Sequence, residues 1–180
     1  VIKLGKNFSN ITLLDNETII AGTAASQKKV SEFAKDNKIS GLEFMSCIPG
    51  SIGGGIRMNS GCFKKEFKDF LISIQVVDFK GLVRSIPANK ISFNYRSIEL
   101  PKDLIFLSAT FKGKQKNSEE INNYMAELNT IKNMAQPTKI KTSGSTFKNP
   151  ISQTDKKVWE LIKSSVSHEI SYGDAVISKK

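Results

Sequence analysis

The chain contains one glycine-rich segment, Ile48-Pro49-Gly50-Ser51-Ile52-Gly53-Gly54-Gly55. Four of its last seven residues are glycine, which permits positive φ and lets the backbone approach a ligand without hindrance from a Cβ atom. Loops of this kind bind diphosphates through N–H groups that converge on the ligand. The spacing fits neither the dinucleotide pattern GxGxxG nor the P-loop pattern, so neither motif is predicted. A tight structural turn is the alternative interpretation.

Apolar patterning on both sides of this segment predicts a mixture of strands and helices. The predicted strands are residues 11–14, 18–21, 70–79, 82–86 and 104–111, and the predicted helices are 26–37, 41–47, 118–134 and 156–162. Strands followed by a glycine-rich loop, more strands and a long helix favour an α+β architecture.

The composition is that of a globular protein, with 39% apolar and 24% charged residues in a chain of 180. This length allows one sizeable domain or two small ones, and Gln136-Pro137-Thr138 is the best candidate for a boundary. No apolar run reaches the length of a membrane span, so no membrane segment is predicted. The first residues contain neither a signal peptide nor an initiator methionine, which suggests a piece of a longer protein.

The formal net charge is +10, yet only three of the 27 basic residues are arginine. Proteins that read nucleic-acid sequence use arginine for bidentate base contacts and cluster their charge. Lysine scattered along the whole chain indicates a general attraction for anions instead. A phosphorylated small molecule is therefore the favoured partner, and a basic nucleic-acid-binding module is a disfavoured alternative.

Cysteine and histidine are too scarce for a metal centre. Cys47 and Cys62 are too few for a disulfide scaffold or a four-ligand zinc site, and buried free thiols are expected. His168 is the only histidine, which argues against a His-rich metal site and a Ser–His–Asp triad.

Two later segments carry side chains suited to chemistry. Arg96, in Phe93-Asn94-Tyr95-Arg96-Ser97, could hold an enolate or carboxylate oxygen with its planar fork, although a surface arginine on an apolar stem is an open alternative. In Ser143-Gly144-Ser145-Thr146-Phe147-Lys148-Asn149-Pro150, Ser145 could transfer a proton. The lysine and asparagine of that segment suit a phosphate or a polar sugar. A bland polar loop is the alternative.

Taken in order, these segments resemble those of UDP-N-acetylenolpyruvoylglucosamine reductases. The resemblance rests on the glycine-rich segment with Met58-Asn59-Ser60-Gly61, on Tyr95-Arg96-Ser97, on Gln136-Pro137 and on residues 144–150, and it runs over essentially all 180 residues. The Met-Asn-Ser-Gly form is similar to the shorter branch of that family.

The resemblance implies an FAD-dependent oxidoreductase. Residues 1–113 would be the second lobe of an FAD-binding domain of the vanillyl-alcohol-oxidase type, and residues 114–180 part of a small α+β domain that binds a UDP-sugar. NADPH would reduce the flavin, which would pass hydride to the enolpyruvyl double bond and give UDP-N-acetylmuramate. Such enzymes are cytoplasmic and serve peptidoglycan synthesis, and with it cell-wall biogenesis, cell shape, the cell cycle and cell division.

The resemblance also implies roles for individual residues. Arg96 would stabilise the enolate, and Ser145 would protonate its carbon. The residues expected around the flavin are Gly50, Ser51, Gly53, Gly54, Asn59 and Gly61. The residues expected to face the substrate are Tyr95, Gly144, Lys148 and Asn149. No metal is implied.

Two parts of the family pattern have no match in this sequence. One is an N-terminal glycine–serine–asparagine loop that holds the FAD pyrophosphate, and the other is a C-terminal catalytic glutamate. We therefore expect a central segment of such a reductase, with the two missing segments as partners in trans. The alternative is an inactive or partner-dependent remnant of that enzyme.

Overall fold

The computed structural model describes residues 3–135, 147–167 and 169–176. They belong to two compact units, Val1–Lys132 and Asn133–Lys180, and each unit is described on its own. The predicted boundary at Gln136-Pro137-Thr138 follows closely after this division and lies outside the described residues. The division into domains 1–113 and 114–180 stays a prediction.

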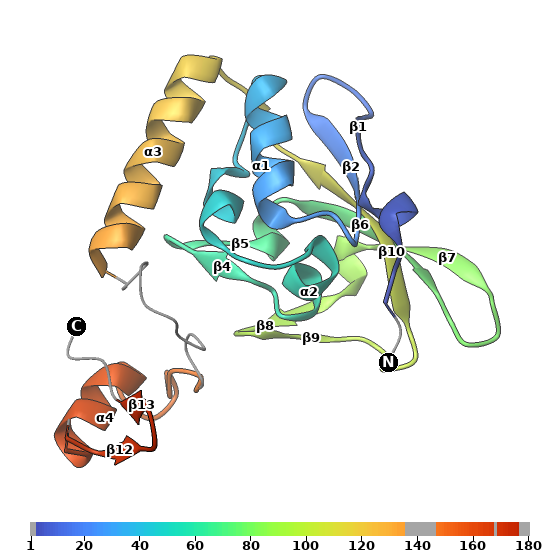
Figure 1. The fold of residues 1–180 in the computed structure, drawn as a ribbon. Helices are drawn as coiled ribbons and strands as arrows, with labels where there is room; N and C mark the ends of the chain where they lie inside the picture. Colours follow the sequence, from blue (N-terminus) through green and yellow to red (C-terminus); the bar gives the residue numbers. More distant parts are fainter. Residues whose placement is uncertain (1–2, 136–146, 168, 177–180) are drawn as a thin grey trace. The chain divides into compact units, whose positions relative to one another are not determined.

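The first unit is built on a five-stranded antiparallel sheet with the strand order β1-β2-β10-β6-β7 (Figure 1). Its strands are β1 (Ile11–Leu13), β2 (Thr18–Gly22), β6 (Leu71–Val77), β7 (Val83–Pro87) and β10 (Ile105–Lys112). All five confirm the predicted strands to within two residues at each end. Strand β10 comes last of the five in the chain but lies in the middle of the sheet, because it pairs with both β2 and β6.

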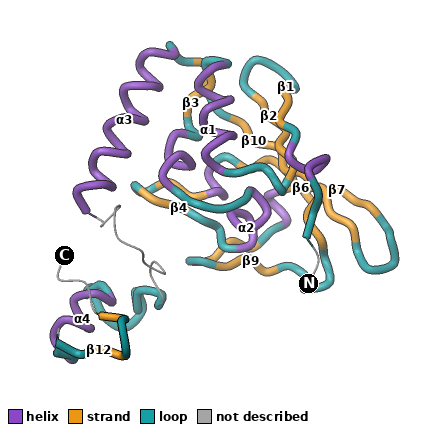
Figure 2. The backbone as a smooth tube through the Cα atoms, viewed as in Figure 1, coloured by secondary structure: helices purple, strands orange, loops and turns teal. Residues whose placement is uncertain are grey.

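Helices α1 (Gln27–Asp36) and α2 (Ile52–Arg57) lie beside these strands (Figure 2) and share one apolar core with them. Val30 of α1 and Ile56 of α2 are fully buried together with Ile74 and Val76 of β6. Ser26 caps α1 by accepting a hydrogen bond from the N–H of Lys29 at 3.2 Å, as predicted.

Four phenylalanines connect the short helical turns to the sheet. The Phe67 ring meets the Phe44 and Phe111 rings edge-on, with centroids 6.1 Å and 5.5 Å apart, and Phe70 stacks on Phe44 at 5.8 Å. Such pairs contribute about 0.5–1.5 kcal/mol each beyond the area they bury. The cluster therefore fixes the chain before and after the glycine-rich segment against β10.

Several elements of the first unit are too short for periodicity to reveal them. They are the pairs β3–β11 (Ile39–Ser40 and Lys114–Gln115), β4–β5 (Gly61–Cys62 and Lys65–Glu66) and β8–β9 (Ser92–Asn94 and Ser97–Glu99), and the 3-10 helices η1 (Lys6–Ser9), η2 (Glu43–Cys47), η3 (Phe67–Asp69) and η4 (Ala88–Lys90). The helix predicted over 41–47 is thus a 3-10 turn.

The long helix α3 (Ser118–Ala135) confirms the prediction and buries a stripe of Ile121, Met125 and Leu128. Its first hydroxyl, that of Ser118, donates to the carbonyl of Lys35 at the end of α1. In the second unit the structure has α4 (Val158–Ser165) and the short strands β12 (Ser171–Tyr172) and β13 (Ala175–Val176), which pair with each other. Among the described helices, none has the length and apolar character needed to cross a membrane.

Candidate functional site

The glycine-rich segment is not the open loop that the sequence predicted. Ser51 is the N-cap of α2, and its hydroxyl accepts a hydrogen bond from the N–H of Gly54 at 3.3 Å. The N–H groups of Ile52 and Gly53 donate to the carbonyls of Ala25 and Thr23, each at 2.9 Å. These three donors are used inside the protein and are not available to a ligand, and the diphosphate-binding role of the segment stays a prediction.

Packing explains some of these glycines and leaves others without a structural reason. A Cβ atom at Gly55 would lie 2.4 Å from the Phe67 ring, and one at Gly53 would lie 3.1 Å from the Cβ of Thr23. Gly50 has φ +118, where other residues are strained. Gly54, by contrast, is exposed, and a Cβ there would meet only the Ser51 hydroxyl at 3.6 Å.

An exposed glycine with no packing partner leaves the backbone open to the flat face of a bound molecule. FAD has both a flat ring system and a diphosphate, and the role of this surface toward such a cofactor stays a prediction. The residues at this surface are Gly50, Ser51, Gly53 and Gly54.

Arg96 occupies the two-residue turn of the β8–β9 hairpin, and its φ is +56. This left-handed conformation costs a residue other than glycine about 1–2 kcal/mol. The guanidinium donates through Nη2 to the carbonyl of Gly61 at 3.0 Å and lies 5.0 Å from the centre of the Tyr95 ring. None of the ion pairs among the described residues includes Arg96, so its charge is not matched by a carboxylate.

Asn59 joins the end of α2 to the same hairpin. It is fully buried, has φ +38, and donates through Nδ2 to the carbonyl of Asn94 at 3.3 Å. Gly61, two residues later, supplies the carbonyl that holds Arg96, and a Cβ atom there would lie 2.3 Å from the carbonyl of Lys65. The structure thus brings residues 59–61 and the hairpin of residues 93–97 together through these contacts, and the predicted roles of Asn59 and Gly61 toward the flavin stay predictions.

The remaining predicted site residues belong to the second unit or lie outside the description. Gly144 and Ser145 are outside the described residues. Lys148 is exposed, and the Asn149 side chain accepts a hydrogen bond from the N–H of Val158 at 3.0 Å, beside the start of α4. Their roles toward a substrate stay predictions.

Residues that sequence reasoning did not assign also lie near this site. The guanidinium of Arg57, at the end of α2, lies 4.5 Å from the centre of the Phe106 ring and donates to the carbonyl of Leu104. Glu66 accepts from Nδ2 of Asn59 at 3.0 Å. Arg57 could have been singled out from the sequence because the chain has only three arginines. Nothing in the sequence distinguished Glu66 from the other acidic residues.

The two cysteines are free thiols, as predicted. The Cys62 thiol donates to the carbonyl of Phe44 at 3.3 Å. Burial, followed by the neighbouring Cys47, raises the pKa of Cys62 to about 11, so this thiol is protonated at neutral pH. No group of three or more metal-binding side chains occurs within the described part of the chain.

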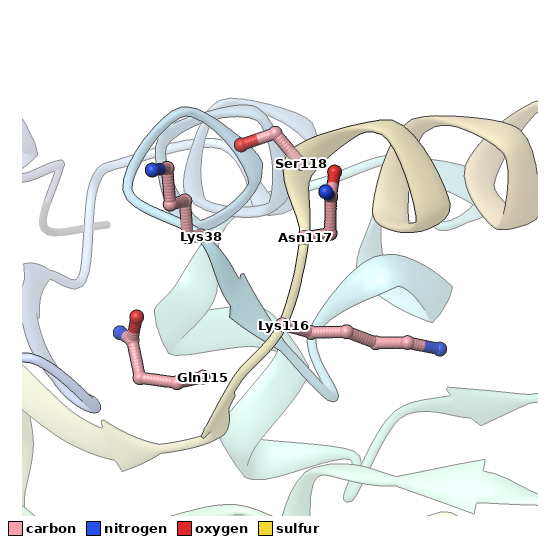
Figure 3. Close-up of a pocket in the computed structure, with 5 residues that line it drawn as sticks. All are labelled: Lys38, Gln115, Lys116, Asn117 and Ser118. Atoms are coloured by element: carbon pink, nitrogen blue, oxygen red, sulfur yellow. The ribbon is translucent and has the colours of Figure 1, made fainter.

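Two hollows in the first unit lie apart from these residues. Figure 3 shows the smaller, of about 440 Å³, lined by Lys38, Gln115, Lys116, Asn117 and Ser118. The larger, of about 970 Å³, contains Lys65, Phe70 and Tyr124 in its lining. Neither contains a residue that the sequence predicted for the site.

Comparison with known proteins first defines the class. Residues 1–86 match the family described as FAD binding domain, which agrees with the cofactor and the fold class expected from the sequence. The chain is an α+β protein whose residues 1–86 are similar to an FAD-binding domain.

The comparison then narrows to one kind of enzyme. The chain is 65% identical, over its full length, to UDP-N-acetylenolpyruvoylglucosamine reductase of Pelagibacter ubique, and 44% identical, over 99% of its length, to that of Rickettsia bellii strain RML369-C. The crystal structure of UDP-N-acetylenolpyruvylglucosamine reductase from Thermus caldophilus superposes with a TM-score of 0.82 over 98% of the chain, at 29% identity. The chain is therefore homologous to these reductases, which confirms the resemblance.

Nearly the whole chain aligns, but with only part of each relative. The chain spans 60% of the Pelagibacter protein, 58% of the Rickettsia protein and 63% of the Thermus caldophilus structure.

Proposed function

We propose that the protein acts in the FAD-dependent, NADPH-linked reduction of UDP-N-acetylglucosamine enolpyruvate to UDP-N-acetylmuramate. The observation that carries this proposal is the Arg96 turn: a strained, half-buried arginine without a carboxylate partner among the described residues, held beside the glycine segment. Strain of this kind persists where the surroundings enforce it, most often at functional sites.

The role of Arg96 is electrostatic. Reduction of the enolpyruvyl double bond gives an enolate whose negative charge develops on oxygen, and a guanidinium held in place stabilises that charge without having to reorganise. One of its nitrogens is anchored by the carbonyl of Gly61, which leaves its other N–H groups to bind the oxygen. Arg96 therefore binds and stabilises the reacting group.

FAD, when bound, supplies the hydride, and NADPH restores it. The residues that would hold this cofactor are Gly50, Ser51, Gly53, Gly54, Asn59 and Gly61. Ser145 donates the proton that completes the reduction, and Tyr95, Gly144, Lys148 and Asn149 bind the UDP-sugar. The reaction belongs to peptidoglycan synthesis in the cytoplasm, and through it to cell-wall biogenesis, cell shape, the cell cycle and cell division.

The proposal is tested by replacing Arg96 with lysine and following the flavin absorbance in a single turnover with the enolpyruvyl substrate. Loss of one oxyanion donor lowers turnover by about 10²–10³-fold, and the flavin is expected to stay bound. Arg84, an exposed arginine on β7, provides the matched control Arg84→Lys, which should reoxidise like the parent protein. Equal rates in the two variants would show that Arg96 does not stabilise the enolate.

A second candidate is a half-enzyme that binds FAD only with a partner segment in trans. The span of about 60% of the relatives' length favours testing it. Retention of flavin through gel filtration would be compared with and without co-expression of the flanking parts of the Pelagibacter relative. Flavin bound only after co-expression would support the half-enzyme, and flavin bound in both cases would argue against it.

A further inference from the structure

The Asn59 amide is the most completely bonded polar side chain around the Arg96 turn. It is fully buried, and its Nδ2 donates to a carboxylate oxygen of Glu66 at 3.0 Å and to the carbonyl of Asn94 at 3.3 Å. Its Oδ1 accepts from the N–H of Lys68 at 3.1 Å. Both donor hydrogens and one acceptor lone pair are thus used within the protein.

From these contacts we infer that Asn59, oriented by Glu66, is a positioning residue for Arg96. Glu66 can only accept, and the Lys68 N–H can only donate, so one orientation of the amide satisfies both. That orientation aims a donor at the carbonyl of Asn94, the residue where the two-residue turn begins. The inference rests on the proposed function, because it assigns Asn59 to the site at which the enolate is stabilised.

The turn needs such support because of its own strain. Arg96 has φ +56, and without external contacts the hairpin would relax toward a conformation in which the guanidinium points elsewhere. The segment after α2 holds both sides of the turn: Asn59 binds the carbonyl of Asn94, and the Gly61 carbonyl binds the guanidinium. Two contacts from residues two positions apart fix the turn more firmly than either contact alone.

The carboxylate of Glu66 is also kept away from Arg96. Glu66 forms an ion pair with the ammonium group of Lys68 at 2.9 Å in addition to its bond with Asn59. Because both contacts use Oε2 of Glu66, the carboxylate faces the amide and Lys68, and it forms no ion pair with Arg96 among the described residues. The pair therefore positions the arginine and leaves its charge for an anionic ligand.

The test is the substitution Asn59→Asp, which keeps the shape of the side chain and replaces the donor by a carboxylate oxygen that faces two acceptors. Phenylglyoxal labelling of Arg96 is measured by peptide mass spectrometry in the folded protein, with Arg84 as the internal reference. We expect Arg96 to label about five- to tenfold faster than in the parent protein, as loss of a buried hydrogen bond implies. The matched control is Ser60→Ala. The Ser60 hydroxyl makes no hydrogen bond among the described residues, so its loss should leave the labelling of Arg96 unchanged.

Turnover provides the second readout. Asn59→Asp should lower kcat and leave the KM for NADPH unchanged, because the arginine acts on the enolate and not on the reductant. Glu66→Gln, which removes the orienting charge at constant volume, should raise Arg96 labelling by a smaller factor, and it carries the test if Asn59→Asp does not fold. Folded Glu66→Gln and Asn59→Asp proteins with parental labelling would overturn the inference. If Arg96 labels faster in the variants but the parent protein itself shows no turnover, the positioning role of Asn59 is supported and the proposed function is refuted.

Discussion

The glycine segment and the Arg96 hairpin differ in how they use polar groups. In the glycine segment the N–H groups of residues 52–54 are bonded within the protein, and no charged side chain is present. In the hairpin an arginine sits in a strained conformation with its charge unmatched among the described carboxylates. The first region offers shape, and the second offers charge.

The difference teaches that the glycines of such a motif can serve packing inside the protein as well as a ligand. Gly53 and Gly55 allow α2 to pack against Thr23 and Phe67, and only Gly54 leaves an exposed surface without a packing reason. Stabilising a developing negative charge requires the Arg96 hairpin. A guanidinium can bind the anion, whereas backbone N–H groups that are already hydrogen-bonded within the protein cannot.

The contrast depends on Cys62, the neighbour of Gly61, remaining a thiol. A thiolate there would partly match the charge of Arg96. With the pKa raised to about 11 by burial, alkylation of Cys62 by iodoacetamide at pH 8 should be about a hundredfold slower than in the unfolded chain, because only the thiolate reacts. The rate should keep rising up to about pH 11, whereas the urea-unfolded chain should level off near pH 9.

The same shift has a consequence for stability. The folded state holds the Cys62 proton more tightly than the unfolded state, whose thiol has the ordinary pKa of 9.0. The contribution to stability is therefore complete below pH 9 and is lost as the pH rises toward 11, because the unfolded state gives up its proton first. A plateau of alkylation near pH 9 in the folded protein would show that the thiol ionises normally and that burial does not hold its proton.

The packing role of the glycine segment is tested by Gly55→Ala. A Cβ atom would lie 2.4–2.9 Å from three atoms of the Phe67 ring, which is fully buried and cannot move away without disturbing the aromatic cluster. Overpacking of this kind costs about 1–3 kcal/mol. Urea unfolding followed by circular dichroism should show a lower midpoint with an unchanged slope, and an unchanged midpoint would mean that the segment is not held by packing.

The strain of the hairpin is tested by comparing Arg96→Gly with Arg96→Ala. Both variants lose the guanidinium and its bond to Gly61, so their difference isolates the left-handed conformation. Glycine should be the more stable of the two by about 1 kcal/mol, since alanine bears the cost of positive φ. At an ordinary turn position alanine would be equal or better, and that order in thermal unfolding would show that position 96 is not strained.

The sequence predicted the sheet and the long helices well because their apolar patterns are long. The strands at 71–77 and 105–112 and the helix at 118–135 bury regular stripes, which periodicity detects. The short pairs β4–β5 and β8–β9 escaped, since two or three residues carry no periodic signal. The helical state of residues 52–57 escaped because three adjacent glycines argue against a helix, and only the Phe67 ring explains Gly55.

The sequence named candidates for the site, and their roles toward cofactor and substrate stay predictions. The motifs identified Arg96, Asn59 and Gly61, and the structure brings these together. Their mutual contacts could not be read from the sequence, because Asn59 reaches the hairpin through a backbone carbonyl, which any residue at position 94 would supply. The role of Glu66 could not be predicted for a similar reason, because it depends on the orientation of the Asn59 amide.

The smallest expected effect belongs to Gly54→Ala, the substitution that tests the surface role of the glycine segment. A Cβ atom at Gly54 meets only the Ser51 hydroxyl at 3.6 Å, so α2 should gain about 0.5–1 kcal/mol from the lower entropy of the unfolded chain. The same methyl group would stand where the flat face of the cofactor approaches, so FAD titrations should show weaker binding although the protein is more stable. Gly5→Ala is the control, because its Cβ would have no neighbour within 4 Å and should leave FAD binding unchanged. Higher stability with unaltered FAD affinity would mean that the cofactor lies elsewhere. The glycine segment would then have a packing role only, and the contrast with the Arg96 hairpin would no longer concern ligand binding.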